Sequence, residues 1–155
     1  MRTIWLEIWL EIWLAIVTCA LAGCSEPVSP EPLGDYTQWK RLDVTGKAPG
    51  HADSYRVIYI NDLAADPTQS LALGYQEGSI VVKEIRDNVD GAPGDLRYIA
   101  IMRRDRPISS ALVDEGGWLF SRAEEPGGSE IHQGFCWSRC HAAAPYNGAW
   151  YDYRR

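Results

Sequence analysis

The segment Ser79-Ile80-Val81-Val82-Lys83-Glu84-Ile85-Arg86 predicts a β-strand at the centre of a sheet. Successive side chains of a strand point to opposite faces. The residues of the two faces are Ile80, Val82 and Glu84 on one, and Val81, Lys83 and Ile85 on the other. Both faces are mostly apolar, and a strand of that kind is usually covered on both sides. We therefore expect a sheet with material packed on each face.

Other segments predict neighbouring strands. They are rich in β-branched and aromatic residues and span 54–61, 96–103 and 118–122, with Gly-containing turns between them. Short helices are expected from Asp35, with Tyr36, Trp39 and Leu42 on one side, and from Asp66 to Gly74. The predicted fold class is α+β: a predominantly antiparallel β-sheet with a few short helices, of which the last carries the motif described next.

A cysteine and histidine motif follows the strands, in the run Cys136-Trp137-Ser138-Arg139-Cys140-His141. Its elements are those of the Cys-X-X-Cys-His haem-attachment signature, although three residues rather than two separate the cysteines here. Two nearby thiols can form thioethers with one haem, and the adjacent imidazole can bind its iron. We expect Cys136 and Cys140 to anchor haem c covalently, with His141 as the iron ligand.

Three other kinds of site could use the same residues. A structural zinc site needs four Cys or His ligands, and the remaining ones are Cys19, Cys24, His51 and His132. A thioredoxin-like redox pair would follow a βαβ pattern, which is not seen here. A plain disulfide would leave His141 unexplained. Haem attachment accounts for more of the motif than any of these.

The first 23 residues are predicted to be a secretory signal, because Arg2 precedes an apolar run over residues 4–21. The following Leu21-Ala22-Gly23-Cys24 resembles the bacterial lipobox, which would make Cys24 the lipidated first residue after cleavage. Ser25 resembles the signal for transfer to the outer membrane, with the protein facing the periplasm. A transmembrane anchor is the alternative. Residues 24–34, rich in Pro, predict a flexible tether, and residues 35–155 the haem domain.

The net charge and the number of cysteines limit the kinds of partner and cross-link that we expect. Removal of the signal leaves 14 basic and 19 acidic side chains, a net charge of −5. A mildly acidic surface argues against a nucleic-acid partner. Cys19 leaves with the signal and Cys24 carries lipid, so no cysteine remains for a disulfide once haem is attached. Membrane contact is expected through the lipid alone.

Several segments resemble the cytochrome P-460 family, which includes the beta-type cytochromes c-prime. The matching segments, in the family's order, are residues 51–61, 75–84, 116–120 and 136–146. The resemblance implies a haem pocket between the sheet and the last helix, iron with five ligands and a homodimer. It also implies an exported location for the c-type haem.

The resemblance assigns roles to Lys83 and Arg56. Lys83 matches the lysine that is bonded to the haem edge in some members, and Arg56 matches a distal arginine, so both are candidate catalytic residues. From the residues alone, Lys83 could instead reach solvent or pair with a carboxylate. Arg56 could form an ordinary ion pair with Asp53 or Asp62.

One departure from the family concerns proton transfer. Members that oxidise hydroxylamine are thought to need a distal carboxylate soon after the haem motif, but residues 142–150 contain neither Asp nor Glu. Glu84 and Asp53 could act only if the fold brought them near. His51 and His132 are expected to be surface or packing residues rather than iron ligands.

The sequence therefore predicts a mono-haem c-type cytochrome with an open distal site, which oxidises hydroxylamine or nitric oxide. One alternative is a protein that binds nitric oxide without turnover, as the beta-type cytochromes c-prime do. Another is an electron carrier, which the lack of a recognisable sixth ligand disfavours. The expected partners are a small nitrogen oxide or gas and an unidentified redox protein.

Overall fold

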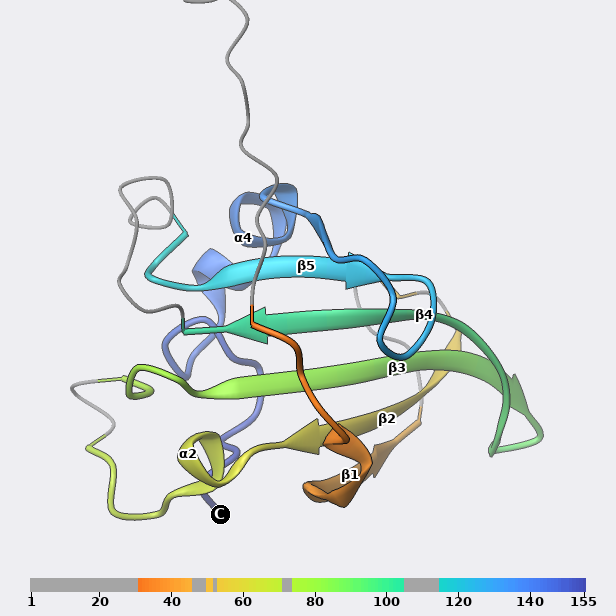
Figure 1. The fold of residues 1–155 in the computed structure, drawn as a ribbon, viewed down its shortest axis with the longest axis horizontal. Helices are drawn as coiled ribbons and strands as arrows, with labels where there is room; N and C mark the ends of the chain where they lie inside the picture. Colours follow the sequence, from red (N-terminus) through yellow and green to blue (C-terminus); the bar gives the residue numbers. More distant parts are fainter. Residues whose placement is uncertain (1–30, 46–49, 52, 71–73, 105–114) are drawn as a thin grey trace, which may run out of the picture.

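The computed structural model describes residues 31–45, 50–51, 53–70, 74–104 and 115–155. These form one six-stranded sheet in which each strand is antiparallel to its neighbours in chain order (Figure 1). The strands are β1 (Lys40–Val44), β2 (Ser54–Ile60), β3 (Ile80–Val89), β4 (Ala92–Arg103), β5 (Leu119–Ala123) and β6 (Ile131–His132). The α+β class with a mostly antiparallel sheet is confirmed. In the described ranges, no helix has the length and apolar character needed to span a bilayer.

The helical elements are short: η1 (Tyr36–Gln38), α2 (Asp62–Ala65), α4 (Phe135–Arg139) and η3 (His141–Ala143). The helix expected from Asp35 is one 3₁₀ turn, because the following residues pair with β2 and place Leu42 opposite Ile58. The prediction of a helix that begins at Asp66 is also wrong, because the helix of this region, α2, ends at Ala65. Asn61 caps α2, and the Asp66 carboxylate instead accepts the Thr68 N–H in a turn; residues 71–73 lie outside the described part.

The prediction of a central strand covered on both faces is confirmed. β3 lies between β2 and β4, and its side chains reach two separate hydrophobic clusters. What we call the C-terminal face carries Ile58, Ile60, Val81, Met102 and Phe120 and is covered by residues 135–153. What we call the N-terminal face carries Tyr55, Val57, Tyr59, Val82 and Ile101 and is covered by residues 33–39. The two terminal segments cross the sheet on opposite sides (Figure 1).

The β3–β4 hairpin ends in a shorter turn than the one that the sequence predicts from Asp90-Gly91 and Pro93-Gly94 together. Asp90 and Gly91 connect the strands with positive φ values of 53° and 86°, as in a two-residue type I′ turn. Pro93 and Gly94, also expected in a turn, lie inside β4. The strands continue to the end of the hairpin, so the ladder is longer than the sequence pattern indicated.

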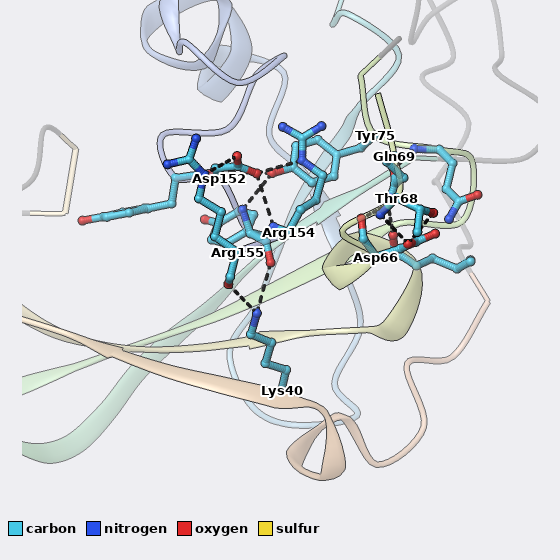
Figure 2. A network of polar contacts seen from close by, with 12 residues as sticks. Lys40, Asp66, Thr68, Gln69, Tyr75, Asp152, Arg154 and Arg155 are labelled. Carbon is cyan, nitrogen blue, oxygen red and sulfur yellow. Dashed lines mark hydrogen bonds and ion pairs between the residues drawn. The ribbon is translucent and has the colours of Figure 1, made fainter. Parts of the chain in front are cut away.

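Polar contacts hold the last residues of the chain against the rest of the domain (Figure 2). The same figure shows the ion pair between Asp152 and Arg154. The Lys40 ammonium donates to the carbonyls of Tyr153 and Arg155 at 3.4 and 2.7 Å. The Tyr75 hydroxyl donates to the Tyr151 carbonyl at 3.3 Å and accepts the Tyr153 N–H at 3.0 Å. These bonds position the segment that forms one wall of the cavity described below.

The start of the described chain also contacts the sheet. Arg103 donates to the Glu31 carbonyl at 2.9 Å, and Leu33 packs against the N-terminal face. Arg103 is itself buried in an ion pair with Glu130. Residues 31–33, at the end of the predicted tether, therefore lie against the domain.

Candidate functional site

A cavity of about 640 Å³ opens on the C-terminal face of the sheet. It brings together five residues that the sequence singled out, from β2, β3 and the C-terminal segment: Arg56, Lys83, Cys136, Cys140 and His141. The other lining residues are Thr45, Gly50, His51, Ile58, Phe135, Arg139, Trp150 and Tyr151. Segments that are far apart in the chain thus enclose one site.

The two thiols project from one helical turn. Cys136 lies in α4 and Cys140 caps its end, where the Cys140 N–H reaches the Cys136 and Trp137 carbonyls at 3.3 Å each. Residues four apart in a helix share a face, with Cβ atoms about 5–6 Å apart. The additional residue in the motif therefore leaves both thiols on the cavity side. Both are unpaired, and burial raises the pKa of Cys136.

His141 is held by one ring nitrogen. Its Nδ1 lies 2.6 Å from the Gly148 carbonyl oxygen, and its ring packs on Phe120 with centroids 4.7 Å apart. A carbonyl can only accept, so Nδ1 carries the proton and Nε2 retains its lone pair. Burial lowers the pKa of His141 and favours the neutral ring. A buried, neutral imidazole oriented through its second nitrogen is the usual form of a metal-binding histidine.

The carbonyl that orients His141 belongs to a tight turn that the sequence analysis missed. Asn147 and Gly148 have φ values of 50° and 88°, and the flanking Tyr146 and Ala149 exchange two backbone hydrogen bonds of 3.1 Å. The Trp118 indole N–H donates to the Asn147 carbonyl at 2.6 Å. Successive carbonyls of one turn thus bind Trp118 and His141. The Asn-Gly dipeptide was the available signal.

Two cationic side chains face the cavity from the sheet. Lys83 lies mid-strand between Ile58 of β2 and Ala100 of β4. Burial, followed by the nearby Arg56 charge, lowers the pKa of Lys83 to about 8, so a fraction of this amine is neutral near physiological pH. Arg56 is buried, and its Nη2 donates to the Thr45 carbonyl at 3.1 Å.

The carboxylates considered as proton acceptors lie elsewhere. Glu84 points to the N-terminal face, where it accepts from the Tyr36 hydroxyl at 2.9 Å and pairs with Arg86 at 2.8 Å. Asp53 is exposed and accepts a 3.4 Å hydrogen bond from Asn88. Among the described residues that line the cavity there is neither Asp nor Glu.

The two other histidines differ in position. His132 pairs with the buried Glu115 at 2.7 Å and does not line the cavity. His51 does line it and is half-buried against Tyr98, a packing position that agrees with the expectation from sequence. Its Nδ1 lies 3.0 Å from the Tyr98 hydroxyl. Burial, followed by the charges of Lys83 and Arg56, lowers the pKa of His51 to about 4.

The donor set and the cavity fit a c-type haem. Two free thiols stand on one side of a short helix, and a neutral imidazole beside them has Nε2 free to bind iron. The apolar walls include Ile58 and Phe135, and cationic groups are available to anionic substituents. We would assign Cys136 and Cys140 to the porphyrin edge and His141 to the iron.

Comparison with known proteins gives the family. The chain matches the family described as Cytochrome P460 over residues 33–150, and so belongs to the cytochrome P460 family. This makes it a haem protein of the c type, with iron as its metal. The match spans the whole sheet and the cysteine and histidine motif. A search of curated proteins found no match.

The half-buried His51 should make stability depend on pH. Between its ordinary pKa of 6.5 and its folded pKa of about 4, the unfolded chain binds more protons than the folded one. The free energy of unfolding therefore falls as pH is lowered through this range. A His51→Gln variant should show a shallower fall in urea unfolding measured from pH 7 to pH 4. Identical slopes for the two proteins would contradict the burial of a neutral imidazole.

Proposed function

We propose that this protein binds one haem c covalently through Cys136 and Cys140, with His141 as the axial ligand and the opposite position open to a small nitrogen oxide. The observation that supports this most is the convergence of both thiols and the oriented imidazole on one cavity. When bound, haem supplies iron with an open coordination position and one-electron redox chemistry. The side chains of the chain determine which ligand enters and how it is held.

The proposed reaction is the oxidation of hydroxylamine or nitric oxide, with Lys83 and Arg56 as the catalytic candidates. Both line the cavity from the sheet, whereas His141 approaches from the C-terminal segment. The Arg56 guanidinium can stabilise negative charge on a ligand or on a haem carboxylate. Lys83, partly neutral at its lowered pKa, is suited to hold or release a proton, or to form a bond to the haem edge.

A second candidate function is binding of nitric oxide without turnover. The described lining of the cavity contains no carboxylate to accept protons from hydroxylamine, which favours a binding role. An electron carrier is the third candidate, and an open sixth position argues against it.

The proposed location is the periplasmic side of the outer membrane. It rests on the sequence of residues 1–23, on Cys24 as the lipidated residue and on residues 24–34 as the tether. An unidentified redox protein and a second copy of the chain are the proposed partners. Incorporation of labelled palmitate into the wild-type protein, and its loss in Cys24→Ala, would test the anchor.

The Lys83 bond and the reaction can be tested on one preparation. If Lys83 is bonded to the haem edge, the pyridine haemochrome spectrum of the wild type should differ from that of c-type haem, and Lys83→Ala should restore the c-type spectrum. Glu84→Gln, the adjacent residue on the opposite face, is the matched control and should change nothing. A c-type spectrum in the wild type would exclude the bond.

Turnover decides between the first two functions. Oxidation of hydroxylamine with an artificial electron acceptor should be measurable in the wild type and should fall at least tenfold in Lys83→Ala, the loss expected when a general acid or base is removed. Tight binding of nitric oxide with no turnover of either substrate would contradict the oxidation reaction and support the function of binding nitric oxide.

A further inference from the structure

His51 is a second imidazole in the cavity, and its ring is held from behind. The Tyr98 hydroxyl lies 3.0 Å from Nδ1. Burial raises the pKa of Tyr98, so the phenol keeps its proton. The Arg122 guanidinium lies 4.2 Å from the centroid of the Tyr98 ring, which fixes this ring in turn. A side chain with such support has a defined orientation.

The contacts determine which His51 nitrogen carries the proton. The ring is neutral, because burial and the charges of Lys83 and Arg56 oppose its protonation. A phenol is a better donor than a neutral imidazole, so the Tyr98 O–H donates to Nδ1 and the ring proton resides on Nε2. The Arg56 guanidinium cannot accept it, and Lys83, with a pKa of about 8, is mostly an ammonium that cannot accept it either. The Nε2–H is therefore available to a ligand in the cavity.

The sheet forms one side of the cavity, and its register places His51 and His141 at different levels along strand β4. His141 stacks on Phe120, which pairs with Met102 of β4, whereas His51 contacts Tyr98 on the same strand. Met102 and Tyr98 are four residues apart, which is about 13 Å at the usual rise of a strand. Lys83 lies opposite Ala100, between these two levels. A group held by His141 would thus have His51 on its far side.

We propose that His51 donates a hydrogen bond from Nε2 to the small ligand bound opposite His141, and that Tyr98 is the positioning residue that keeps the proton on Nε2. The inference rests on the proposed function, since it requires an open position on that side. The ligands that fit are diatomic or nitrogen-oxide molecules with a terminal acceptor atom. His51 would thus supply a polar group to the ligand in a cavity whose described lining contains neither Asp nor Glu.

The test uses carbon monoxide on the reduced holoprotein, with the C–O stretching frequency as the readout. A donor beside the bound oxygen lowers this frequency, so His51→Phe should move the band to higher wavenumber. His51→Gln, whose amide can still donate, should move it less. The dissociation rate of nitric oxide should rise about tenfold in His51→Phe, the effect of losing one hydrogen bond.

Tyr98→Phe tests the positioning role without changing the ring volume. Loss of the hydroxyl should allow both tautomers of His51 and split the C–O band into two. Tyr59→Phe, on the N-terminal face, is the matched control and should leave one unshifted band. Nitrogen-15 NMR of the three histidines in the diamagnetic carbon monoxide complex should show His51 protonated on Nε2 in the wild type and in Tyr59→Phe, and a mixture of tautomers in Tyr98→Phe.

The outcomes separate this inference from the proposed function. A wild-type holoprotein that binds neither gas would overturn both. Gas binding with a C–O band that is the same in the wild type and His51→Phe would overturn the role of His51 alone. A resting low-spin spectrum that disappears in both His51 variants would show that His51 is an iron ligand, and would also overturn it.

Discussion

Replacing Cys136 and Cys140 with serine together with Lys83→Ala should abolish covalent haem attachment. In the wild type, extraction with acidified acetone should leave the haem on the protein, whereas in the triple variant it should remove all of it; the double cysteine variant should retain haem only if Lys83 is bonded to the haem edge. The physical reason is that both thiols line the cavity from one helical turn and have no disulfide partner. Ser138→Ala, an exposed change within the same motif, is the control and should retain the haem.

Trypsin can show whether both thiols react despite the three-residue spacing. Cleavage after Arg139 separates the cysteines into peptides 123–139 and 140–154. Two thioethers to one haem would keep these peptides joined, and mass spectrometry should detect the joined species. Separate peptides with haem on only one of them would show a single attachment. Covalent haem retained in a variant that lacks both cysteines and Lys83 would contradict the proposed site.

Gly148→Ala should be among the most destabilising single changes in the domain. At φ +88°, a Cβ would lie 2.8 and 2.9 Å from Trp118 ring atoms and 3.1 Å from Trp137. A left-handed conformation costs a non-glycine residue about 1–2 kcal/mol, and overpacking adds about 1–3 kcal/mol. We expect a loss of about 3 kcal/mol in the free energy of unfolding, measured with urea.

The control for this change is Gly91→Ala. Gly91 occupies the same position of a similar turn, at φ +86°, but a Cβ there would meet nothing within 4 Å. The Gly91→Ala variant should therefore lose only the part of the free energy of unfolding that comes from the left-handed conformation, about 1–2 kcal/mol. Because the Gly148 carbonyl orients His141, Gly148→Ala should also shift the haem absorption spectrum, which Gly91→Ala should not. Equal losses in the two variants would contradict the close packing of the turn.

The sequence predicted those parts of the site that depend on short spacing. The Cys136, Cys140 and His141 motif and the alternation around Lys83 are local patterns, and the structure places them around one cavity. The Asn147-Gly148 turn could also have been predicted, because its dipeptide is a strong turn signal.

Other parts were outside the reach of local patterns. Leu42 of β1 is predicted to lie in a helix, since the spacing of Tyr36, Trp39 and Leu42 suits a helix when the pairing of β1 with β2 is unknown. His51 lies in a connection between strands, and nothing in its neighbours along the chain indicates that it faces the cavity. Its partner Tyr98 is 47 residues away.

The amino-acid sequence by itself determined that this chain has a two-faced central strand, a pair of thiols next to an imidazole, and membership of a haem-binding family. Those properties follow from residue type and from spacing within one turn or one strand. Only the tertiary structure decided that Glu84 faces away from the cavity, that Gly148 orients His141 and that His51 lines the same cavity. Sheet register and chain crossings set these relations, because they bring together residues whose separation along the chain carries no information about distance.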